Sequence, residues 1–161
     1  MKKSNIRIRK AKKEDCKEIA ELINNPKNTG LLIPKNANQI MTQIPFYFVA
    51  DNGGQLVGNC GFKIWPDGKV EIISLVVTRE FQSLGLGKRL IKRCLRRAKA
   101  YGFVKIFALT TSPDLFKKLG FKTIPYRRLP GKIWQDCVNC PRNAGKPGDV
   151  KCNEVAVAIN F

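Results

Sequence analysis

Between residues 46 and 109 the hydrophobic residues change from a strand-like to a helix-like spacing, and few folds accommodate that order. Before the change, three predicted strands follow one another across short turns rich in Asp, Asn and Gly, and strands joined in this way pair antiparallel. After it, apolar residues at helical spacing predict a helix from Leu86 to Tyr101, which Gly102 ends. The strands are predicted at 46–50, 55–64 and 69–77, and another follows the helix at 103–109.

The segment from Lys69 to Leu109 is therefore a strand–helix–strand unit, which predicts two parallel strands joined by a right-handed crossover. We predict an α+β fold with a mixed, mostly antiparallel sheet, built by residues 1–161 as a single domain. The other predicted elements are a strand at 5–9, helices at 12–24 and 113–119, and strands at 121–126 and 155–161.

Histidine is absent from the 161 residues, which excludes Ser-His-Asp and Cys-His catalysis and any zinc site that needs imidazole. A general base must then be a carboxylate, Lys, Tyr, Cys or water. The composition, 43% hydrophobic and 26% charged, is that of a globular protein. The basic start has no apolar signal-peptide core and no long apolar run follows, so we expect a cytoplasmic protein that does not cross a membrane.

The loop from Gln82 to Gly87 lies between a predicted strand and a predicted helix and carries two glycines. Glycines let a backbone approach a phosphate closely, and a helix N-terminus directs N–H groups at an anion. Lys88 and Arg89 oppose the helix dipole in the first turn, and an anionic ligand would remove that penalty. The loop matches neither the Rossmann nor the Walker fingerprint, so the alternative is an ordinary strand–turn–helix without a ligand.

The same loop reads Gln-x-x-Gly-x-Gly, which resembles the acetyl-coenzyme A motif of the GNAT acyltransferase superfamily. Within that superfamily, the chain is most similar to the acetyltransferase domain of short, stand-alone N-acetylglutamate synthases, the amino-acid N-acetyltransferases of arginine biosynthesis. Two signatures carry this closer resemblance, Leu109-Thr110-Thr111 and the Phe-x-x-x-Gly-Phe of residues 116–121. Further similar stretches are 5–9, 30–33, 57–62, 71–77 and 129–130.

The resemblance implies a GNAT fold and acetyl-coenzyme A as the co-substrate. It places the pantetheine arm along the backbone of Leu75, Val76 and Val77, where an N–H near Val76 would stabilise the thioester oxyanion. It places the pyrophosphate on the loop and the first helical turn, at Gln82, Ser83, Leu84, Gly85, Leu86, Gly87, Lys88 and Arg89.

Glu71 opens an apolar strand at the position where many GNAT enzymes carry a catalytic glutamate, so the resemblance makes it the general base. Burial among apolar residues would make a carboxylate more basic, whereas the alternative is a glutamate at a solvated strand start. The acid that protonates the leaving thiolate is open, because Phe116 stands where many members have Tyr. Ser112 is our first candidate for the acid, with Tyr126 and solvent as the alternatives.

L-glutamate as the acceptor would require cations for two carboxylates, and we predict a substrate site at Leu32, Lys35 and Arg79. The other available cations are Lys63, Arg127 and Arg128, although a basic residue on a chain of net charge +18 is usually just solvated. Lys35 stands where related synthases tend to have Arg, and Lys binds a carboxylate without the bidentate geometry of Arg. Another small-molecule amine or a protein amine is the alternative acceptor.

Positive charge is concentrated in residues 81–135, which hold 14 Lys or Arg against the single acid Asp114. A basic helix could bind nucleic acid, which leaves a non-enzymatic nucleic-acid-binding GNAT domain as a further alternative. No aromatic residue interleaves with the basic residues of the helix, which argues against stacking on single strands. A polyanionic coenzyme is the nearer explanation of the charge.

A cysteine-bearing arm is predicted at 127–154, between the last two strands. Cys137, Cys140 and Cys152 have the spacing of thiolate ligands for a structural metal such as zinc, with reduced thiols or a disulfide as alternatives. A fourth ligand could be Asp136, Cys60 or water. Cys16 and Cys94 lie on apolar helix faces and are predicted core residues, and the sequence leaves open a monomer or a homodimer.

Overall fold

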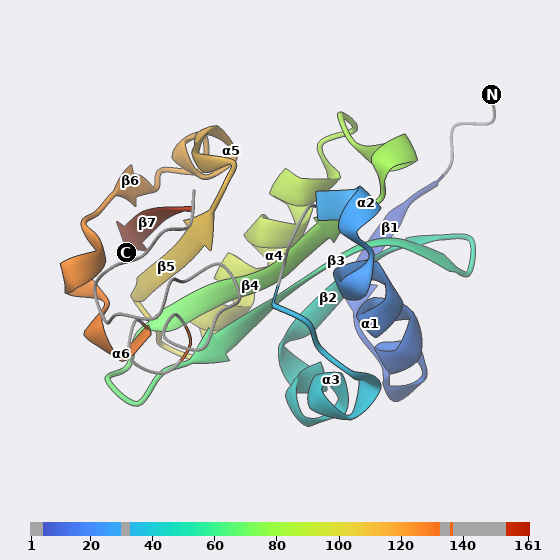
Figure 1. Ribbon diagram of the computed structural model, residues 1–161, viewed down its shortest axis with the longest axis horizontal. Helices are drawn as coiled ribbons and strands as arrows, with labels where there is room; N and C mark the ends of the chain where they lie inside the picture. Colours follow the sequence, from blue (N-terminus) through green and yellow to red (C-terminus); the bar gives the residue numbers. More distant parts are fainter. Residues whose placement is uncertain (1–4, 30–32, 133–135, 137–153) are drawn as a thin grey trace. The chain divides into compact units, whose positions relative to one another are not determined.

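The computed structural model describes residues 5–29, 33–132, 136 and 154–161 (Figure 1). The chain divides into two compact units, residues 1–106 and residues 107–161. Each unit is described by itself below.

The first unit is built on four antiparallel strands in the order β1-β2-β3-β4. The predicted meander is confirmed, because β2, β3 and β4 follow one another across tight turns. Gly53 and Gly54 form the first turn with positive φ angles of 64° and 100°, which glycine adopts without steric cost. The strands are β1 (Arg7–Lys10), β2 (Tyr47–Asn52), β3 (Gln55–Ile64) and β4 (Val70–Val77).

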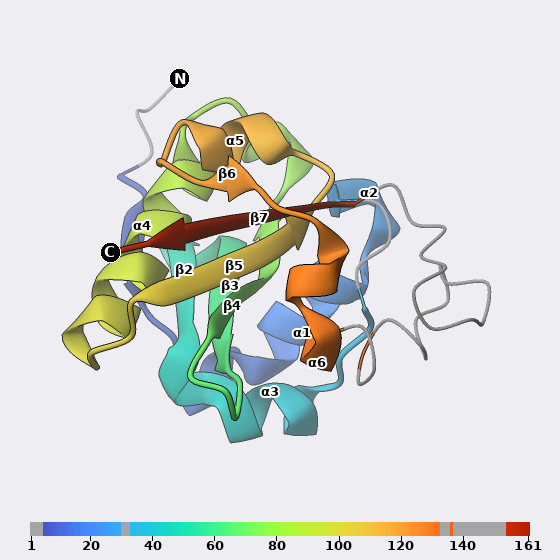
Figure 2. The same cartoon turned by 90° about the vertical axis from the view of Figure 1, so that its left-hand side faces the viewer.

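Helices cover both faces of β2–β4, with α1 (Cys16–Asn24) and α3 (Ala37–Gln43) on one side and α4 (Leu86–Ala100) on the other (Figure 2). The α1 side buries Ile19, Ile23 and Ile40 against Tyr47 and Val49 of β2. Removing such side chains from water stabilises the unit by about 1.5–3 kcal/mol each. The α4 face buries Leu90, Ile91, Cys94 and Ala98, all 0% exposed.

Two of the helices in the first unit were not predicted, α2 (Pro26–Thr29) and α3. The N-terminus of α3 is fixed by a capping box, in which the Asn36 side chain accepts from the Gln39 N–H and the Gln39 side chain accepts from the Asn36 N–H. Short 3-10 helices also flank these elements, η1 (Lys13–Asp15), η2 (Ile44–Phe46) and η3 (Arg79–Phe81).

The second unit holds most of β5 (Lys105–Thr110), which begins in the first unit, and has the strand order β5-β7-β6. β6 (Lys122–Thr123) pairs antiparallel with β7 (Val155–Asn160). The predicted strand 121–126 is thus shorter than expected, because Pro125 precedes the 3-10 helix η4 (Tyr126–Arg128). α5 (Pro113–Lys117) packs on β6 and β7, and the short α6 (Pro130–Lys132) follows η4.

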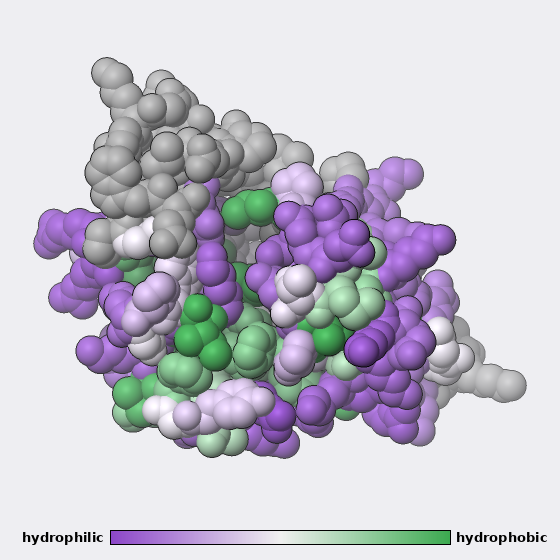
Figure 3. All heavy atoms as spheres, turned by 90° about the horizontal axis from the view of Figure 1, so that it is seen from below, coloured by the Kyte–Doolittle hydropathy of each residue, from purple (hydrophilic) through white to green (hydrophobic). Residues whose placement is uncertain are grey.

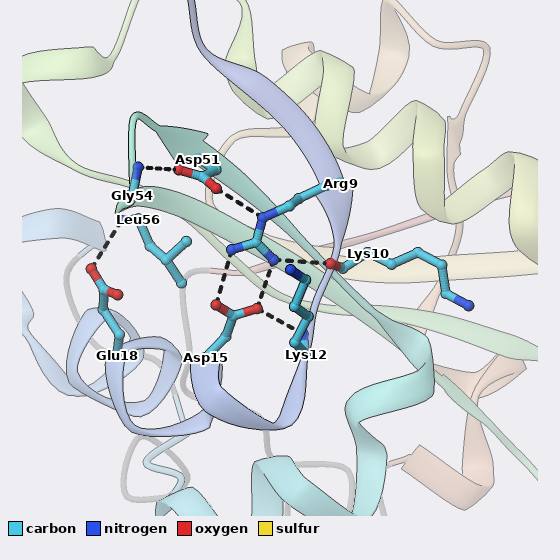
Figure 4. A network of polar contacts seen from close by, with 8 residues as sticks. All are labelled: Arg9, Lys10, Lys12, Asp15, Glu18, Asp51, Gly54 and Leu56. Carbon is cyan, nitrogen blue, oxygen red and sulfur yellow. Dashed lines mark hydrogen bonds and ion pairs between the residues drawn. The ribbon is translucent and has the colours of Figure 1, made fainter.

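An ion-pair network ties the N-terminal strand to the rest of the first unit (Figure 4). The guanidinium of Arg9 on β1 donates to both carboxylate oxygens of Asp15, at 2.8 and 3.0 Å, and to Asp51 at 2.9 Å. Asp51 also accepts from the Gly54 N–H, and Glu18 accepts from the Leu56 N–H. Because Arg9 favours their ionised forms, the pKa values of Asp15 and Asp51 lie below their ordinary value.

We predict that Arg9→Met lowers the free energy of unfolding at pH 7 by about 2–3 kcal/mol, because it leaves two half-buried carboxylates without their cation. A lowered carboxylate pKa adds stability that is present at neutral pH and lost as pH falls through the folded-state pKa. Urea titrations at pH 7 and pH 3 should therefore show the difference between Arg9→Met and the natural protein shrinking in acid.

Lys69→Met is the matched control, because Lys69 pairs with Asp67 in a more exposed position. It should cost less than about 1 kcal/mol at pH 7. An Arg9→Met defect of the same size at both pH values would contradict the ion-pair account.

Candidate active site

The most unusual backbone in the first unit is a bulge in the middle of β4. Asn59 of β3 pairs with Val76 of β4, and Gly61 pairs with Ile73. The two pairs are therefore two residues apart on β3 and three residues apart on β4, so β4 has one extra residue. Ser74 lies in the bulge with φ at 54°, in the left-handed region that residues with a side chain rarely adopt. A bulge takes one residue out of the ladder and re-aims the strand, and strained backbone of this kind clusters at functional sites.

Two buried side chains hold the bulge in place. The Tyr47 hydroxyl donates to Ser74 Oγ at 3.0 Å, and the Asn59 side-chain amide donates to the Ser74 carbonyl at 2.7 Å. Tyr47 and Asn59 are both 0% exposed. Burial raises the pKa of Tyr47, which keeps its phenol protonated as a donor.

Two glycines of β3 make room for this arrangement. A Cβ at Gly61 would lie 2.9 Å from the Tyr47 ring, so only glycine lets the ring cross the strand there. A Cβ at Gly58 would lie 2.7 Å from the Val76 carbonyl, so only glycine allows β4 to approach so closely. The bulge, Tyr47 and the glycines therefore form one packed unit.

The predicted phosphate loop follows β4 and η3 directly. Ser83 and Gly85 are both left-handed, with φ of 71° and 74°, which turns the backbone sharply into α4. A Cβ at Gly85 would meet nothing within 4 Å, so open space lies beside this backbone. The next residues, Leu86, Gly87 and Lys88, occupy the first helical turn, whose N–H groups have no partner within the helix.

Two polar side chains of the segment 82–89 make hydrogen bonds to backbone carbonyls elsewhere in the first unit. The Gln82 side-chain amide donates to the Val77 and Asn28 carbonyls, at 3.0 Å each, and so fixes the loop to β4 and α2. The Arg89 guanidinium donates to the Ile6 carbonyl at 3.2 Å. Gln82 therefore shapes the loop. The groups at this turn that suit an anion are the backbone N–H groups and the positive end of the helix dipole.

Two further basic residues of α4 are only partly solvated because they pack on aromatic rings. Arg93 lies over the Phe48 ring and Arg97 over the Tyr101 ring, at 5.3 and 4.8 Å from the ring centroids. On the face drawn in Figure 3, hydrophilic residues alternate with several groups of apolar residues.

Glu71 lies on β4 three residues before Ser74 and is buried, with 3% of its surface exposed. This overturns the alternative of a glutamate at a solvated strand start. Its Oε2 accepts a hydrogen bond from the indole Nε1 of Trp65 at 3.1 Å, and Trp65 is itself 5% exposed. Lys63 pairs with Glu71 across β3 and β4, and its ammonium lies 4.0 Å from the centroid of the Trp65 ring. No spacing or motif in the sequence predicts that Trp65 contacts this site.

The predicted substrate residues are spread over the first unit. Lys35 is half-buried, with its backbone held by the Asn24 side chain and its ammonium 3.4 Å from Gln43 Oε1. Arg79 is exposed on η3, directly after β4. Leu32 lies outside the described residues.

The acid candidates lie in the second unit. Ser112 is exposed at the start of α5, and its N–H donates to Thr110 Oγ1 at 2.8 Å. Phe116 is buried against Phe121 in an edge-to-face pair, so it serves the core. The Tyr126 hydroxyl donates to the Glu154 carbonyl, which gives it a structural role within the unit.

The cysteines separate into two groups. Cys16, Cys60 and Cys94 are buried free thiols, as predicted for Cys16 and Cys94, and burial raises the pKa of both those thiols. Cys60, the cysteine considered as a fourth ligand for the arm, is 0% exposed in the first unit. Among the residues that the structure describes, no three His, Cys, Asp or Glu side chains are grouped to hold a metal. Cys137, Cys140 and Cys152 lie outside them.

The model of the acetyltransferase (GNAT) family matches residues 14–121, which include β4, its bulge and the phosphate loop. The chain belongs to this family. It is accordingly an acetyl-coenzyme A dependent N-acetyltransferase, and the non-enzymatic alternative is set aside. None of the described helices combines the length and apolar character needed to cross a bilayer.

Relatives add detail to this assignment. An uncharacterized N-acetyltransferase from Chlorobaculum tepidum is 31% identical over 150 residues, which is 93% of each chain. An amino-acid acetyltransferase from Neisseria meningitidis is 28% identical over 89% of this chain but only 33% of its own. The present chain thus spans about a third of the length of that amino-acid acetyltransferase.

Solved structures confirm the predicted fold. The N-acetylglutamate synthase of Neisseria gonorrhoeae, complexed with coenzyme A and N-acetyl-glutamate, superposes with a TM-score of 0.79 at 23% identity, over 99% of this chain and 36% of that one. A Mycobacterium tuberculosis protein in complex with coenzyme A superposes with a TM-score of 0.78 at 17% identity, over 96% and 99% of the two chains. The fold is the mixed, mostly antiparallel GNAT sheet with one parallel pair of strands.

We predict that Tyr47→Phe lowers the unfolding free energy by about 1 kcal/mol, because the Ser74 hydroxyl loses its donor. Since the bulge is then less firmly held, the maximal rate of acetyl transfer should fall about 10-fold. Urea denaturation and steady-state kinetics with acetyl-coenzyme A check both effects. Tyr101→Phe, an exposed tyrosine of the same unit, is the matched control and should leave both unchanged. Equal behaviour of the two variants would show that the Tyr47 hydroxyl does not support the site.

Proposed function

We propose that the protein transfers the acetyl group of acetyl-coenzyme A to the α-amino group of an amino acid, with L-glutamate as the acceptor. The observation that carries the proposal is the buried Glu71 carboxylate on the same strand as the bulge. The glycine loop, where we propose that the pyrophosphate binds, follows that strand after one short helix. The amino-acid acetyltransferases among the relatives, and the bound N-acetyl-glutamate of the Neisseria gonorrhoeae structure, support the choice of acceptor. The product would be N-acetylglutamate, made in the cytoplasm for arginine biosynthesis.

The reaction proposed is a direct attack. Glu71 takes a proton from the acceptor ammonium, and the free amine attacks the thioester carbonyl carbon. The carbonyl oxygen becomes an oxyanion, which the backbone N–H near Val76 stabilises. As the tetrahedral intermediate collapses, the carbon–sulfur bond breaks, the nitrogen releases its remaining extra proton to solvent as the amide forms, and the coenzyme leaves as a thiolate that solvent protonates.

The coenzyme would lie along β4 and the loop that follows it. Its pantetheine arm would run along Leu75, Val76 and Val77, where the bulge takes β4 out of its regular ladder. Its pyrophosphate would accept from N–H groups at the N-terminus of α4. The residues proposed for that contact are Gln82, Ser83, Leu84, Gly85, Leu86, Gly87, Lys88 and Arg89.

The acceptor carboxylates would bind cations near this strand. Lys35 and Arg79 supply them, with Leu32 beside the acceptor. We propose Lys35 for one carboxylate because Asn24 holds its backbone at two points and so fixes the base of its side chain.

Two measurements on the natural protein and on Glu71→Gln test the proposed acceptor and base. Release of coenzyme A thiol, followed with a panel of amino acids, a polyamine and a peptide, should be fastest with L-glutamate. Glu71→Gln should lower the rate by about 100- to 10,000-fold, because proton removal by the base is lost. The matched control is Glu21→Gln, an exposed glutamate on α1, which should keep the natural rate.

Each part of the proposal can fail separately. Turnover of another amine without turnover of L-glutamate would reject the acceptor and retain the enzyme class. An unchanged rate and pH profile in Glu71→Gln would reject the base.

For the arm we propose, from sequence, that Cys137, Cys140 and Cys152 bind a structural metal such as zinc. Protein prepared under reducing, anaerobic conditions should contain about one metal ion per chain, measured by elemental analysis. Cys137→Ser should lose that metal, whereas Cys16→Ala, at a buried thiol of α1, should retain it. Natural protein without stoichiometric metal would overturn the proposal.

A further inference from the structure

The hairpin that joins β3 to β4 places an aromatic side chain against the proposed base. After Lys63 and Ile64 the chain turns at Trp65, whose backbone N–H donates to the Lys69 carbonyl at 2.9 Å. The Gly68 N–H donates to the Trp65 carbonyl at 3.0 Å, so Trp65 is held from both sides. A residue at the end of a hairpin usually points to solvent, yet Trp65 is 5% exposed and its indole N–H meets Glu71.

We propose that Trp65 is a positioning residue, which fixes the Glu71 carboxylate by holding one of its oxygens. The inference rests on the proposed role of Glu71 as the base. An indole N–H is a donor only, so it orients a carboxylate without competing for the proton that the carboxylate must accept. Holding Oε2 at 3.1 Å sets the plane of the carboxylate and therefore the position of Oε1. A catalytic group held in one geometry reacts faster than one that rotates freely.

Lys63 contacts the face of the Trp65 ring. Its ammonium lies 4.0 Å from the centroid of the Trp65 ring, a favourable cation–π geometry. Because Lys63 is also the cross-strand partner of Glu71, the base, the indole and the cation form one group on β3, β4 and the turn between them. Lys63 therefore restrains the indole through this contact with its ring.

The kinetic test is Trp65→Phe, which keeps an aromatic ring and removes the N–H. We expect the maximal rate to fall about 10-fold while the KM for acetyl-coenzyme A changes less than about twofold. The same substitution in a Glu71→Gln background should have no further effect, because Trp65 then has no base to position. Equal losses in both backgrounds would mean that Trp65 acts through the fold alone, and would overturn the inference.

A second test does not depend on turnover. The chain has two tryptophans, so Trp134→Phe leaves Trp65 as the single indole fluorophore. Its emission should shift in Glu71→Gln, because the acceptor of its indole N–H changes, whereas the exposed Glu21→Gln should leave it unchanged. An unchanged emission spectrum in Glu71→Gln would show that Trp65 does not sense Glu71 and would overturn the inference.

The two tests separate this inference from the proposed function. A shifted emission in Glu71→Gln, together with no acetyl transfer by the natural protein to any amine of the panel, would reject the function and not the contact. A catalytic defect in Glu71→Gln with a natural rate in Trp65→Phe would reject the positioning role and leave the function standing.

Discussion

The hydrogen bonds that hold Ser74 in the left-handed region are the interaction on which the site depends. Without a restraint, a serine at φ 54° would relax toward ordinary strand geometry and restore the ladder with β3. Tyr47 and Asn59 supply that restraint from inside the core, where water does not compete for the hydrogen bonds. The active strand is therefore irregular because its neighbours are well packed, and the glycines at positions 58 and 61 are what let those neighbours approach.

The same strand carries the proposed base, and the hairpin before it carries the group that orients that base. Glu71 is fixed by Trp65, Ser74 by Tyr47, and the loop after β4 by Gln82. Each contact is made by a side chain from a different part of the first unit. The chemistry is thus placed on rigid elements, which is what precise geometry requires.

The positive charge of the chain has more than one use in this account. Several arginines of α4 pack on aromatic rings or reach a backbone carbonyl, so they hold the helix in place as well as raising the local potential. Lys88, in the first turn of α4, has no favourable place with respect to the helix dipole unless an anion binds there. A polyanionic coenzyme explains that residue better than a nucleic acid does, because its pyrophosphate is a compact ligand for one helix N-terminus.

Much of the fold was predictable, because the spacing of the hydrophobic residues and the positions of the turn-forming residues agree along most of the chain. β3, β4 and α4 lie within one residue of their predicted bounds, since glycines and tight turns mark their ends. α3 was not predicted because only Ile40 of its seven residues is buried, so its apolar residues do not recur at helical spacing. Its capping box is nevertheless visible in the sequence. β6 is shorter than predicted because Pro125 ends the extended segment and precedes η4.

The site was predictable only in part. Glu71 and the glycine loop are visible because their residue types and spacing carry the chemistry. The left-handed Ser74 and the Trp65–Glu71 hydrogen bond arise from packing between strands, and no spacing in the sequence reports them.

The most direct measurement is the change in backbone amide NMR shifts when coenzyme A is titrated into the protein. The account predicts the largest changes at Val76, in the β4 bulge, and along residues 83–88, where the pyrophosphate would bind. Changes confined to the exposed basic residues of α4, such as Lys92 and Arg96, and abolished by moderate salt would contradict it, because they would indicate a nonspecific anion surface rather than a coenzyme site on β4.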